Sequence, residues 1–163
     1  EPKGLAQAFI LGEQFIGDDN VTMVLGDNIF VGHDFSAEIQ AFEDGALIFA
    51  KEVDDPDRFG VVWFDGQMRA TQIIEKPTAP DSNWAVVGLY TYGPDVVDVA
   101  KGIEPSPRGE LEITTVNDYY LQAGRLTVHP FEGKWYDAGT PDSLLEAGNA
   151  IRDRMQEQGG TIL

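Results

Sequence analysis

The chain has 163 residues, a formal net charge of −17 and a hydrophobic content of 42%, which fits one domain of ordinary size and excludes a disordered chain. The acidic charge argues against a general nucleic-acid binder, and no apolar run approaches the roughly 20 residues of a membrane span. With no cysteine and two histidines, the sequence predicts neither a disulfide framework nor a zinc site, which fits a cytoplasmic protein.

The first half of the chain is predicted to contain two helices and several strands. A rough apolar stripe predicts a helix over residues 4–16, and a turn at 17–20 leads into the first strand. Ser36 is expected to cap a short helix that runs to Phe42, and Asp65-Gly66 is a good hairpin turn. The expected strands are residues 21–26, 45–53, 60–65 and 69–75.

The second half continues the alternation of strands and helices. Proline directly after Gly93 starts one helix, and Gly124 fits the residue that follows a helix C-terminus. This alternation, without a repeat or a domain linker, predicts one α/β domain over residues 1–163. The expected elements here are a strand at 84–92, a helix from Pro94, a helix from Thr114 or Thr115 to Gly124, a strand at 125–131 and a helix from Thr140 to about Gln158.

Asp27 and Asp137 each end a short apolar run. A strand that ends in an acid delivers a carboxylate to the carboxyl edge of a sheet, where open α/β proteins bind ligands. Two such acids can hold Mg²⁺, which takes one or two carboxylates together with substrate phosphates. Either acid taken alone fits a turn or a helix N-cap better, so the predicted metal site depends on the two carboxylates lying together.

Glu75 and Lys76 lie between the two acids in the sequence, at the end of another apolar segment. A surface Glu-Lys pair is the simpler interpretation of these two residues by themselves. Together with two metal ligands, however, a lysine that faces phosphate indicates phosphoryl or nucleotidyl transfer.

Seven short stretches form an ordered series that covers nearly the whole chain. They are Gly-Leu-Ala-Gln-Ala-Phe (4–9), Leu-Gly-Asp-Asn-Ile-Phe (25–30), Phe-Gly-Val-Val (59–62), Glu-Lys-Pro (75–77), Ser-Asn-Trp-Ala-Val-Val-Gly-Leu-Tyr (82–90), Arg-Gly-Glu-Leu-Glu-Ile-Thr (108–114) and Asp-Ala-Gly-Thr (137–140). In these stretches the chain resembles the sugar-1-phosphate nucleotidylyltransferases, especially the glucose-1-phosphate thymidylyltransferases. Each stretch is weak evidence alone, whereas seven in order are strong evidence.

The resemblance implies a Rossmann-like, mixed and mostly parallel sheet flanked by helices, the nucleotide-diphospho-sugar transferase fold. Full-length members begin with a glycine-rich loop and a lysine that bind the triphosphate, and neither occurs in these 163 residues. We therefore expect residues 1–163 to be a partial catalytic domain, without the opening strands and the C-terminal helical tail, and inactive or weak alone. The first residue, Glu1, also fits a chain cut from something longer.

The resemblance also implies roles for charged residues. Asp27 and Asp137 would ligate Mg²⁺ between the two substrates. Lys76 would bind the sugar phosphate, with Arg108 as a second cation. Taken by itself, Arg108 fits an arginine in a surface loop.

Six further positions would bind the sugar or the base by the same resemblance. Glu75 would accept hydrogen bonds from sugar hydroxyls, and Val86 would present backbone groups to the glucose. Trp135 would lie beside the metal aspartate, although a lone Val or Trp is usually core. The remaining positions are Gly60, where the backbone would approach the sugar, and Gly4 and Leu5, which would border the base.

The implied reaction joins dTTP and glucose-1-phosphate to give dTDP-glucose and pyrophosphate. The sugar phosphate oxygen is already charged, so it can attack in line without a general base or a covalent intermediate. Members of the family form homo-oligomers and carry a second nucleotide-sugar site near Phe30 to His33. Val31 replaces the usual aromatic residue there, which puts feedback regulation in doubt.

Two alternatives stay open at this point. The first is a uridylyl- or cytidylyltransferase, because the residues that read the base lie largely outside these 163 residues. The second is a non-catalytic sugar-phosphate-binding or regulatory module that lacks the triphosphate loop. Paired metal ligands favour an enzyme over a binding module.

Overall fold

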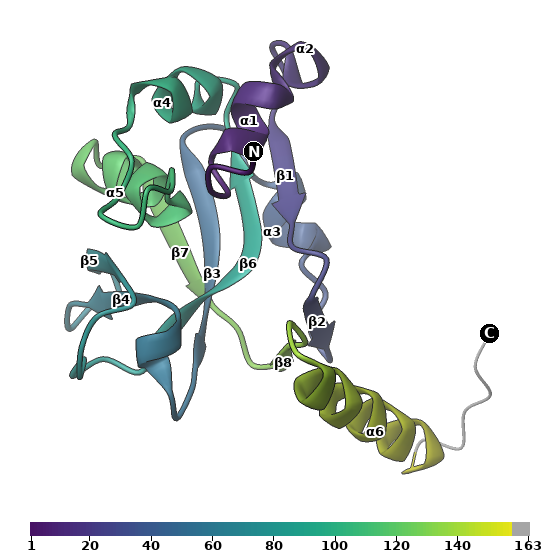
Figure 1. The fold of residues 1–163 in the computed structure, drawn as a ribbon. Coiled ribbons are helices and arrows are strands. Elements are labelled where there is room, and N and C mark those ends of the chain that lie inside the picture. The colour runs from purple at the N-terminus through teal and green to yellow at the C-terminus, as the bar shows by residue number, and fades with distance from the viewer. Residues whose placement is uncertain (158–163) are drawn as a thin grey trace.

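In the computed structural model of this protein, residues 1–157 are described and form a mixed α/β fold (Figure 1). The helices are α1 (Gln7–Leu11), α2 (Glu13–Ile16), α3 (Ser36–Gln40), the short 3₁₀ helix η1 (Pro56–Arg58), α4 (Val96–Gly102), α5 (Ile113–Gln122) and α6 (Pro141–Glu157). The strands are β1 (Val21–Val24), β2 (Asn28–Val31), β3 (Ala46–Glu52), β4 (Gly60–Phe64), β5 (Ala70–Glu75), β6 (Trp84–Tyr92), β7 (Leu126–Pro130) and β8 (Lys134–Asp137).

Strand β6 is the centre of the main sheet. It is nine residues long and buried along almost its whole length, as its unbroken apolar and aromatic run predicts. The strand order is β5-β4-β6-β3-β7, and β1 also pairs with β6. At its carboxyl half β6 therefore lies between β1 and β3.

The prediction of a mostly parallel sheet is wrong for the described part of the chain, in which most strand pairs are antiparallel. Strand β3 pairs with β7 in parallel, whereas β6 pairs antiparallel with β1, β3 and β4, and β4 with β5 is an antiparallel hairpin. Apolar runs predict where strands lie but carry no information on their direction, which is set by non-local pairing.

A second, two-stranded sheet positions the candidate site. Strands β2 and β8 are more than 100 residues apart in the sequence and pair antiparallel, with Asn28 opposite Asp137. In Figure 1 this ribbon lies beside the main sheet, and α6 extends away from it. The pairing brings the two predicted acids to one end of the ribbon.

The sheet packs on its two faces against different groups of side chains. Helices α1, α4 and α5 contribute Phe9, Val96 and Tyr120 to the larger buried cluster, in which the Phe9 and Tyr92 rings make an edge contact at 5.2 Å. A smaller aromatic cluster joins Phe35, beside α3, to Phe49 and Phe131. Both clusters surround β6 and fix it as a rigid support.

Two of the predicted helices differ in detail from the observed ones. The helix expected over 4–16 is divided at Gly12 into α1 and α2, because Gly12 leaves helical geometry and caps the first segment. Ser36 is the first residue of α3 rather than its cap, and its N–H donates to Asp34 Oδ1 at 3.0 Å.

The end of α5 follows the prediction, since Gly124 has φ +68° directly after the last turn. Helix α6 is described to Glu157, and the expected end near Gln158 lies outside the described residues. No helix within residues 1–157 is long and apolar enough to cross a membrane.

Candidate functional site

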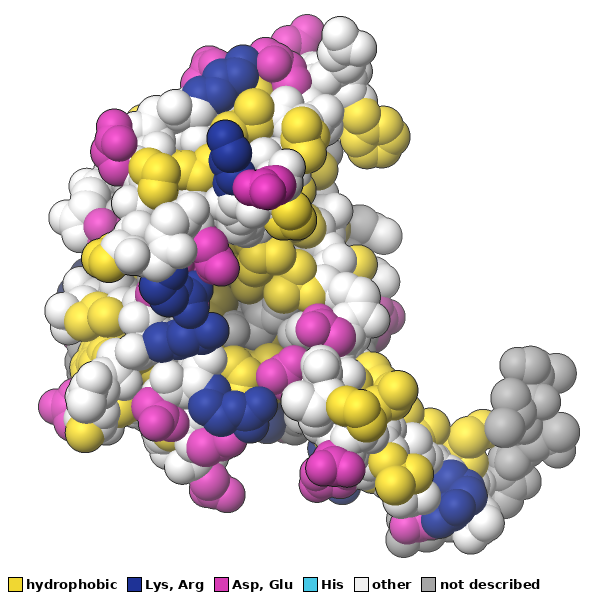
Figure 2. All heavy atoms as spheres, in the orientation of Figure 1, with side chains coloured by type: hydrophobic (Ala, Val, Ile, Leu, Met, Phe, Trp, Pro, Cys, Tyr) yellow, Lys and Arg dark blue, Asp and Glu magenta, His cyan; other side chains and the backbone are white. Residues whose placement is uncertain are grey.

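One cavity of about 180 Å³ brings together most of the residues that the sequence singles out. It opens between the carboxyl end of β1, the middle of β6, the β4–β5 hairpin and β8. Figure 2 shows a hollowed face with Lys and Arg side chains along one side and Asp and Glu side chains opposite. The predicted residues that line the cavity are Leu5, Asp27, Gly60, Glu75, Lys76, Val86, Trp135 and Asp137.

Asp27 and Asp137 converge on the backbone at Gly139. A Cβ atom built on Gly139 would lie 3.2 Å from Asp27 Oδ2 and 3.3 Å from Asp137 Oδ1. The N–H of Ala138 donates to the Asp27 carbonyl at 2.8 Å, so the two chain segments are also joined through the backbone. Two carboxylate oxygens therefore approach one point from opposite segments.

This pair of carboxylates fits a magnesium ion bound in part by substrate. Mg²⁺ needs oxygen ligands and is usually held by one or two carboxylates together with phosphate oxygens and water. No group of three or more His, Cys, Asp and Glu side chains suited to a metal occurs among residues 1–157. The chain thus offers two ligands, and the remaining ones would have to come from phosphate and water.

Arg58 contacts the carboxylate of Asp137 from the side of η1. Its Nη2 atom lies 3.4 Å from Asp137 Oδ2, while its Nη1 atom donates to Asp55 Oδ2 at 2.8 Å. The hydrogen bond with Asp55 raises the pKa of the Arg58 guanidinium above its ordinary value. Arg58 therefore adds a positive charge at the edge of the cavity.

Glu75 lies at the opposite wall, where β5 pairs with β4. Gly60 is its partner in the antiparallel ladder, and Thr114 donates a short hydrogen bond to Glu75 Oε2. A Cβ on Gly60 would lie 3.0 Å from Thr114 Oγ1 and 3.5 Å from Glu75 Oε2. Glycine at position 60 keeps this wall open, and one carboxylate oxygen of Glu75 is held by Thr114.

Lys76 follows Glu75 in an unusual backbone conformation. Its φ is +43°, a left-handed value that costs a non-glycine residue of order 1 kcal/mol or more. The Lys76 N–H donates to the Phe59 carbonyl at 2.9 Å, which closes the β4–β5 ladder. Lys76 lines the cavity, and within residues 1–157 its ammonium group makes no hydrogen bond or ion pair.

Two predicted site residues do not line the cavity. Arg108 lies behind Glu75 at 3.7 Å and makes closer ion pairs with Glu110 and Glu112, each at 3.0 Å. The hydrogen bond to Glu112 raises the pKa of Arg108. The Arg108 guanidinium is thus largely neutralised by these carboxylates. It could contact a phosphate only if the ion pairs with Glu110 and Glu112 were broken.

Gly4 also lies outside the cavity lining, although its neighbour Leu5 is part of it. Gly4 has φ +105°, and a Cβ there would lie 2.5 Å from the Leu111 carbonyl oxygen. The Leu111 carbonyl accepts the Ala6 N–H at 3.1 Å. Glycine at this position lets the first residues lie against the segment before α5, which brings Leu5 to the cavity.

Sequence reasoning missed several residues of the site. Asn28 accepts hydrogen bonds from Gly88 N and Trp135 Nε1 and donates to Asp27. Asn28 and Gly88 lie inside two of the stretches that carry the resemblance, at 25–30 and 82–90. These stretches could therefore have pointed to both residues, although no role was predicted for either. The lining residues that were not predicted are Leu25, Asn28, Arg58, Phe59, Gly88, Tyr90, Ile113 and Thr114.

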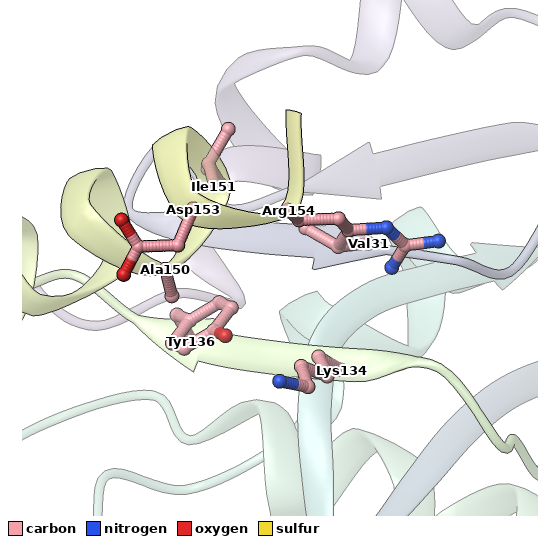
Figure 3. A pocket seen from close by; sticks show the side chains of 7 residues that line it. All are labelled: Val31, Lys134, Tyr136, Ala150, Ile151, Asp153 and Arg154. Atoms are coloured by element: carbon pink, nitrogen blue, oxygen red, sulfur yellow. The ribbon is translucent and has the colours of Figure 1, made fainter. Parts of the chain in front are cut away.

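A second and larger cavity, of about 470 Å³, lies between α6 and the β2–β8 ribbon (Figure 3). Its lining includes Val31, Lys134, Tyr136 and Arg154 and none of the residues predicted for the catalytic site. Asp27, Asp137, Lys76 and Glu75 all line the smaller cavity. The smaller cavity is therefore the candidate active site.

The sequence model of the family described as "Nucleotidyl transferase" matches residues 1–154. The chain belongs to this nucleotidyl transferase family. The glucose-1-phosphate thymidylyltransferase of Neisseria meningitidis serogroup A is 50% identical over 157 residues, which cover 93% of this chain and 54% of that protein. The chain thus spans about half the length of the curated relatives that it matches.

Solved structures of similar proteins have the same fold. A Bacillus anthracis protein assigned as a glucose-1-phosphate thymidylyltransferase and crystallised with sucrose superposes with a TM-score of 0.85 at 42% identity, over 94% of this chain and 63% of that one. A UDP-glucose pyrophosphorylase in complex with UDP-glucose gives 0.83 at 25% identity, over 94% and 64%. These similarities confirm the predicted nucleotide-diphospho-sugar transferase fold.

Proposed function

We propose that the gene product containing these residues transfers the thymidylyl group of dTTP to glucose-1-phosphate, giving dTDP-glucose and pyrophosphate. The observation that carries the proposal is the convergence of Asp27, Asp137, Lys76 and Glu75 on one cavity. Those groups come from three separate segments, and together they suit a metal ion, a phosphate and the hydroxyls of a sugar. Membership of the nucleotidyl transferase family supports the reaction class.

Asp27 and Asp137 are the residues that would hold Mg²⁺. When bound, such an ion supplies Lewis-acid stabilisation of charge on the phosphates and a template for the two substrates. Lys76 binds and orients the phosphate of glucose-1-phosphate through its ammonium group. Arg58, at the same rim, offers a second positive charge near Asp137.

Glu75 and its neighbours orient the sugar. The Glu75 oxygen that is not held by Thr114 can accept a hydrogen bond from a sugar hydroxyl. The open backbone at Gly60 lets the ring approach β4, and Val86 on β6 forms the floor of the cavity. This arrangement favours a hexose phosphate over a bare phosphate, because it binds both ends of the molecule.

The transfer itself needs no general base from the protein. A phosphate oxygen of glucose-1-phosphate forms a bond to the α-phosphorus of dTTP, and the bond from that phosphorus to the β-phosphate oxygen breaks. The electron pair leaves on pyrophosphate. Since the attacking oxygen is already anionic, catalysis comes from in-line positioning and charge neutralisation.

The thymine preference rests on similarity. The relative at 50% identity acts, by its name, on glucose-1-phosphate as a thymidylyltransferase, whereas the similar structure with UDP-glucose is 25% identical. A uridylyl- or cytidylyltransferase is the nearest alternative chemistry. We further propose that the protein works in the cytoplasm as a homo-oligomer.

The triphosphate-binding glycine-rich loop that the resemblance implies is not among these 163 residues. We therefore expect this chain alone to bind glucose-1-phosphate and a divalent cation, with weak turnover. Calorimetric titration of glucose-1-phosphate into the chain, with and without Mg²⁺, tests the binding part of the proposal.

The reaction is tested by pyrophosphate release from the complete gene product, with glucose-1-phosphate and dTTP, UTP or CTP in separate assays. The expected result is release with dTTP at the highest rate. Faster release with UTP or CTP would contradict the thymidylyl assignment. Binding of glucose-1-phosphate without release from any triphosphate would favour the non-catalytic module.

A further inference from the structure

Asn28 occupies the junction between the two metal-binding acids and the central strand β6. Its side chain makes three hydrogen bonds to three segments that are distant in sequence from one another. We propose that Asn28 is a positioning residue, which holds Asp27 and the strand that carries Asp137 at the separation needed for one divalent cation. The inference rests on the proposed function, because it assumes that these two acids bind a metal.

The donor side of the amide fixes Asp27. Asn28 Nδ2 donates to Asp27 Oδ1 at 2.9 Å, while the other oxygen, Oδ2, is the one that faces Gly139. A carboxylate whose one oxygen is held by a hydrogen bond presents the second oxygen in a fixed direction. Hydrogen-bond partners of this kind orient metal ligands and tune their affinity.

The acceptor side of the amide fixes β8 against β6. Asn28 Oδ1 accepts the Gly88 N–H at 2.8 Å and the Trp135 Nε1–H at 2.7 Å. A carboxamide oxygen has two acceptor positions, and both are used here. Trp135 precedes Asp137 by two residues on β8, so this bond ties the strand that carries the second acid to Asn28.

The backbone reinforces the same junction. Asn28 lies directly opposite Asp137 in the β2–β8 ladder, and the Leu25 N–H donates to the Gly88 carbonyl at 2.9 Å. A Cβ on Gly88 would lie 2.7 Å from both Cγ and Oδ1 of Asn28. Glycine at position 88 is therefore required for the amide to reach β6 at all.

Paramagnetic broadening by Mn²⁺ tests this role in the chain itself. Mn²⁺ is titrated into ¹⁵N-labelled protein, and the amide resonance of Gly139, which lies between the two acids, is compared with that of Gly102 on α4. In wild type we expect selective broadening at Gly139. In Asn28→Ala the Mn²⁺ concentration for half-maximal broadening should rise about 10-fold or more, as for other hydrogen-bond partners of metal ligands.

A matched control separates positioning from stability. Thr22→Val removes the 2.9 Å side-chain hydrogen bond between Thr22 and Thr91, which joins β1 to β6 away from the acids. This variant should lose some thermal stability and keep the wild-type Mn²⁺ dependence. If Asn28→Ala fails to fold, Gly88→Ala replaces it, because the added methyl would lie 2.7 Å from the Asn28 amide and from Leu25 Cδ1 and so displaces the amide without substituting either acid.

Three outcomes are distinguishable. Broadening at Gly139 that Asn28→Ala and Gly88→Ala leave within about 2-fold would overturn the positioning role while supporting the metal site. Absence of local broadening in wild type would overturn the metal site, and the role of Asn28 with it. In the complete gene product, added Mg²⁺ should recover turnover in Asn28→Ala; a loss that no Mg²⁺ concentration relieves would contradict positioning.

Discussion

Asp27 Oδ2 and Asp137 Oδ1 lie 3.2 Å and 3.3 Å from the position that a Cβ atom would take on Gly139. Asp27 lies in the turn directly before β2 and Asp137 ends β8, and the pairing of these two strands joins segments more than 100 residues apart. A small residue at position 139 therefore leaves the space between the carboxylates open. This relationship is the structural basis of the proposed metal site.

Gly139→Ala should weaken divalent cation binding while the fold is kept. The methyl group would crowd both carboxylates at a distance tighter than ordinary contact, and the acids must move apart to accept it. We expect about a 10-fold loss of Mn²⁺ affinity, comparable to other displaced metal ligands. Gly148→Ala on α6, where an added methyl meets no atom within 4 Å, is the control and should bind Mn²⁺ as wild type does.

Lys76→Ala should weaken binding of glucose-1-phosphate. Hydrogen bonds to charged groups contribute about 1.5–3 kcal/mol, so we expect about a 10- to 100-fold rise in the dissociation constant measured by calorimetry. Lys101→Ala is a suitable control, since Lys101 pairs with Glu13 across α4 and α2. Equal affinity in Lys76→Ala and wild type would remove Lys76 from the site.

Arg58→Gln should strengthen divalent cation binding in the absence of substrate. The Arg58 guanidinium lies 3.4 Å from Asp137 Oδ2 and would compete with a cation for this oxygen. Because half of the Arg58 side chain is exposed, this ion pair contributes less than about 1 kcal/mol. The predicted gain in Mn²⁺ affinity is thus no more than about 5-fold. Arg69→Gln removes the exposed pair with Asp65 instead and should have no effect. Weaker binding in Arg58→Gln would contradict this competition.

Tyr92→Phe should destabilise the fold without altering the site. Tyr92 is fully buried, burial raises the pKa of its hydroxyl, and this hydroxyl donates to the buried Asn117 Oδ1 at 2.5 Å. Its loss leaves an unsatisfied buried acceptor, which costs about 1–3 kcal/mol of unfolding free energy. Urea unfolding measures the change, with the half-exposed Tyr119→Phe as control. A change below about 0.5 kcal/mol would show that this bond contributes little.

Local patterns in the sequence predict much of the fold. The apolar run at 84–92 predicts β6 to the residue, because a strand buried on both faces needs no alternation. The division of the first helix at Gly12 was not predicted, since the apolar stripe continues through it. The predicted strand directions were wrong because pairing depends on contacts between segments that are distant in the sequence, which local patterns do not show.

The candidate site was predicted to a similar extent and for related reasons. Asp27, Asp137 and Lys76 carry charges whose chemistry is recognisable in the sequence, and all three line the cavity. Arg108 is equally recognisable, yet its pairing with Glu112 holds it outside the lining. Asn28 was missed because its role depends on hydrogen bonds to residues 60 and 107 positions away, which the local sequence does not reveal.

The most direct test of the account follows the label of α-³²P dTTP into a sugar nucleotide, with the complete gene product, glucose-1-phosphate and Mg²⁺. We expect labelled product from wild type and a rate lower by at least about 100-fold in both Asp27→Asn and Asp137→Asn, because the lost charge stabilisation amounts to several kcal/mol. Each variant should keep the wild-type unfolding temperature within a few degrees. A near-normal Mg²⁺-dependent rate in either variant would contradict the proposed metal-dependent transfer.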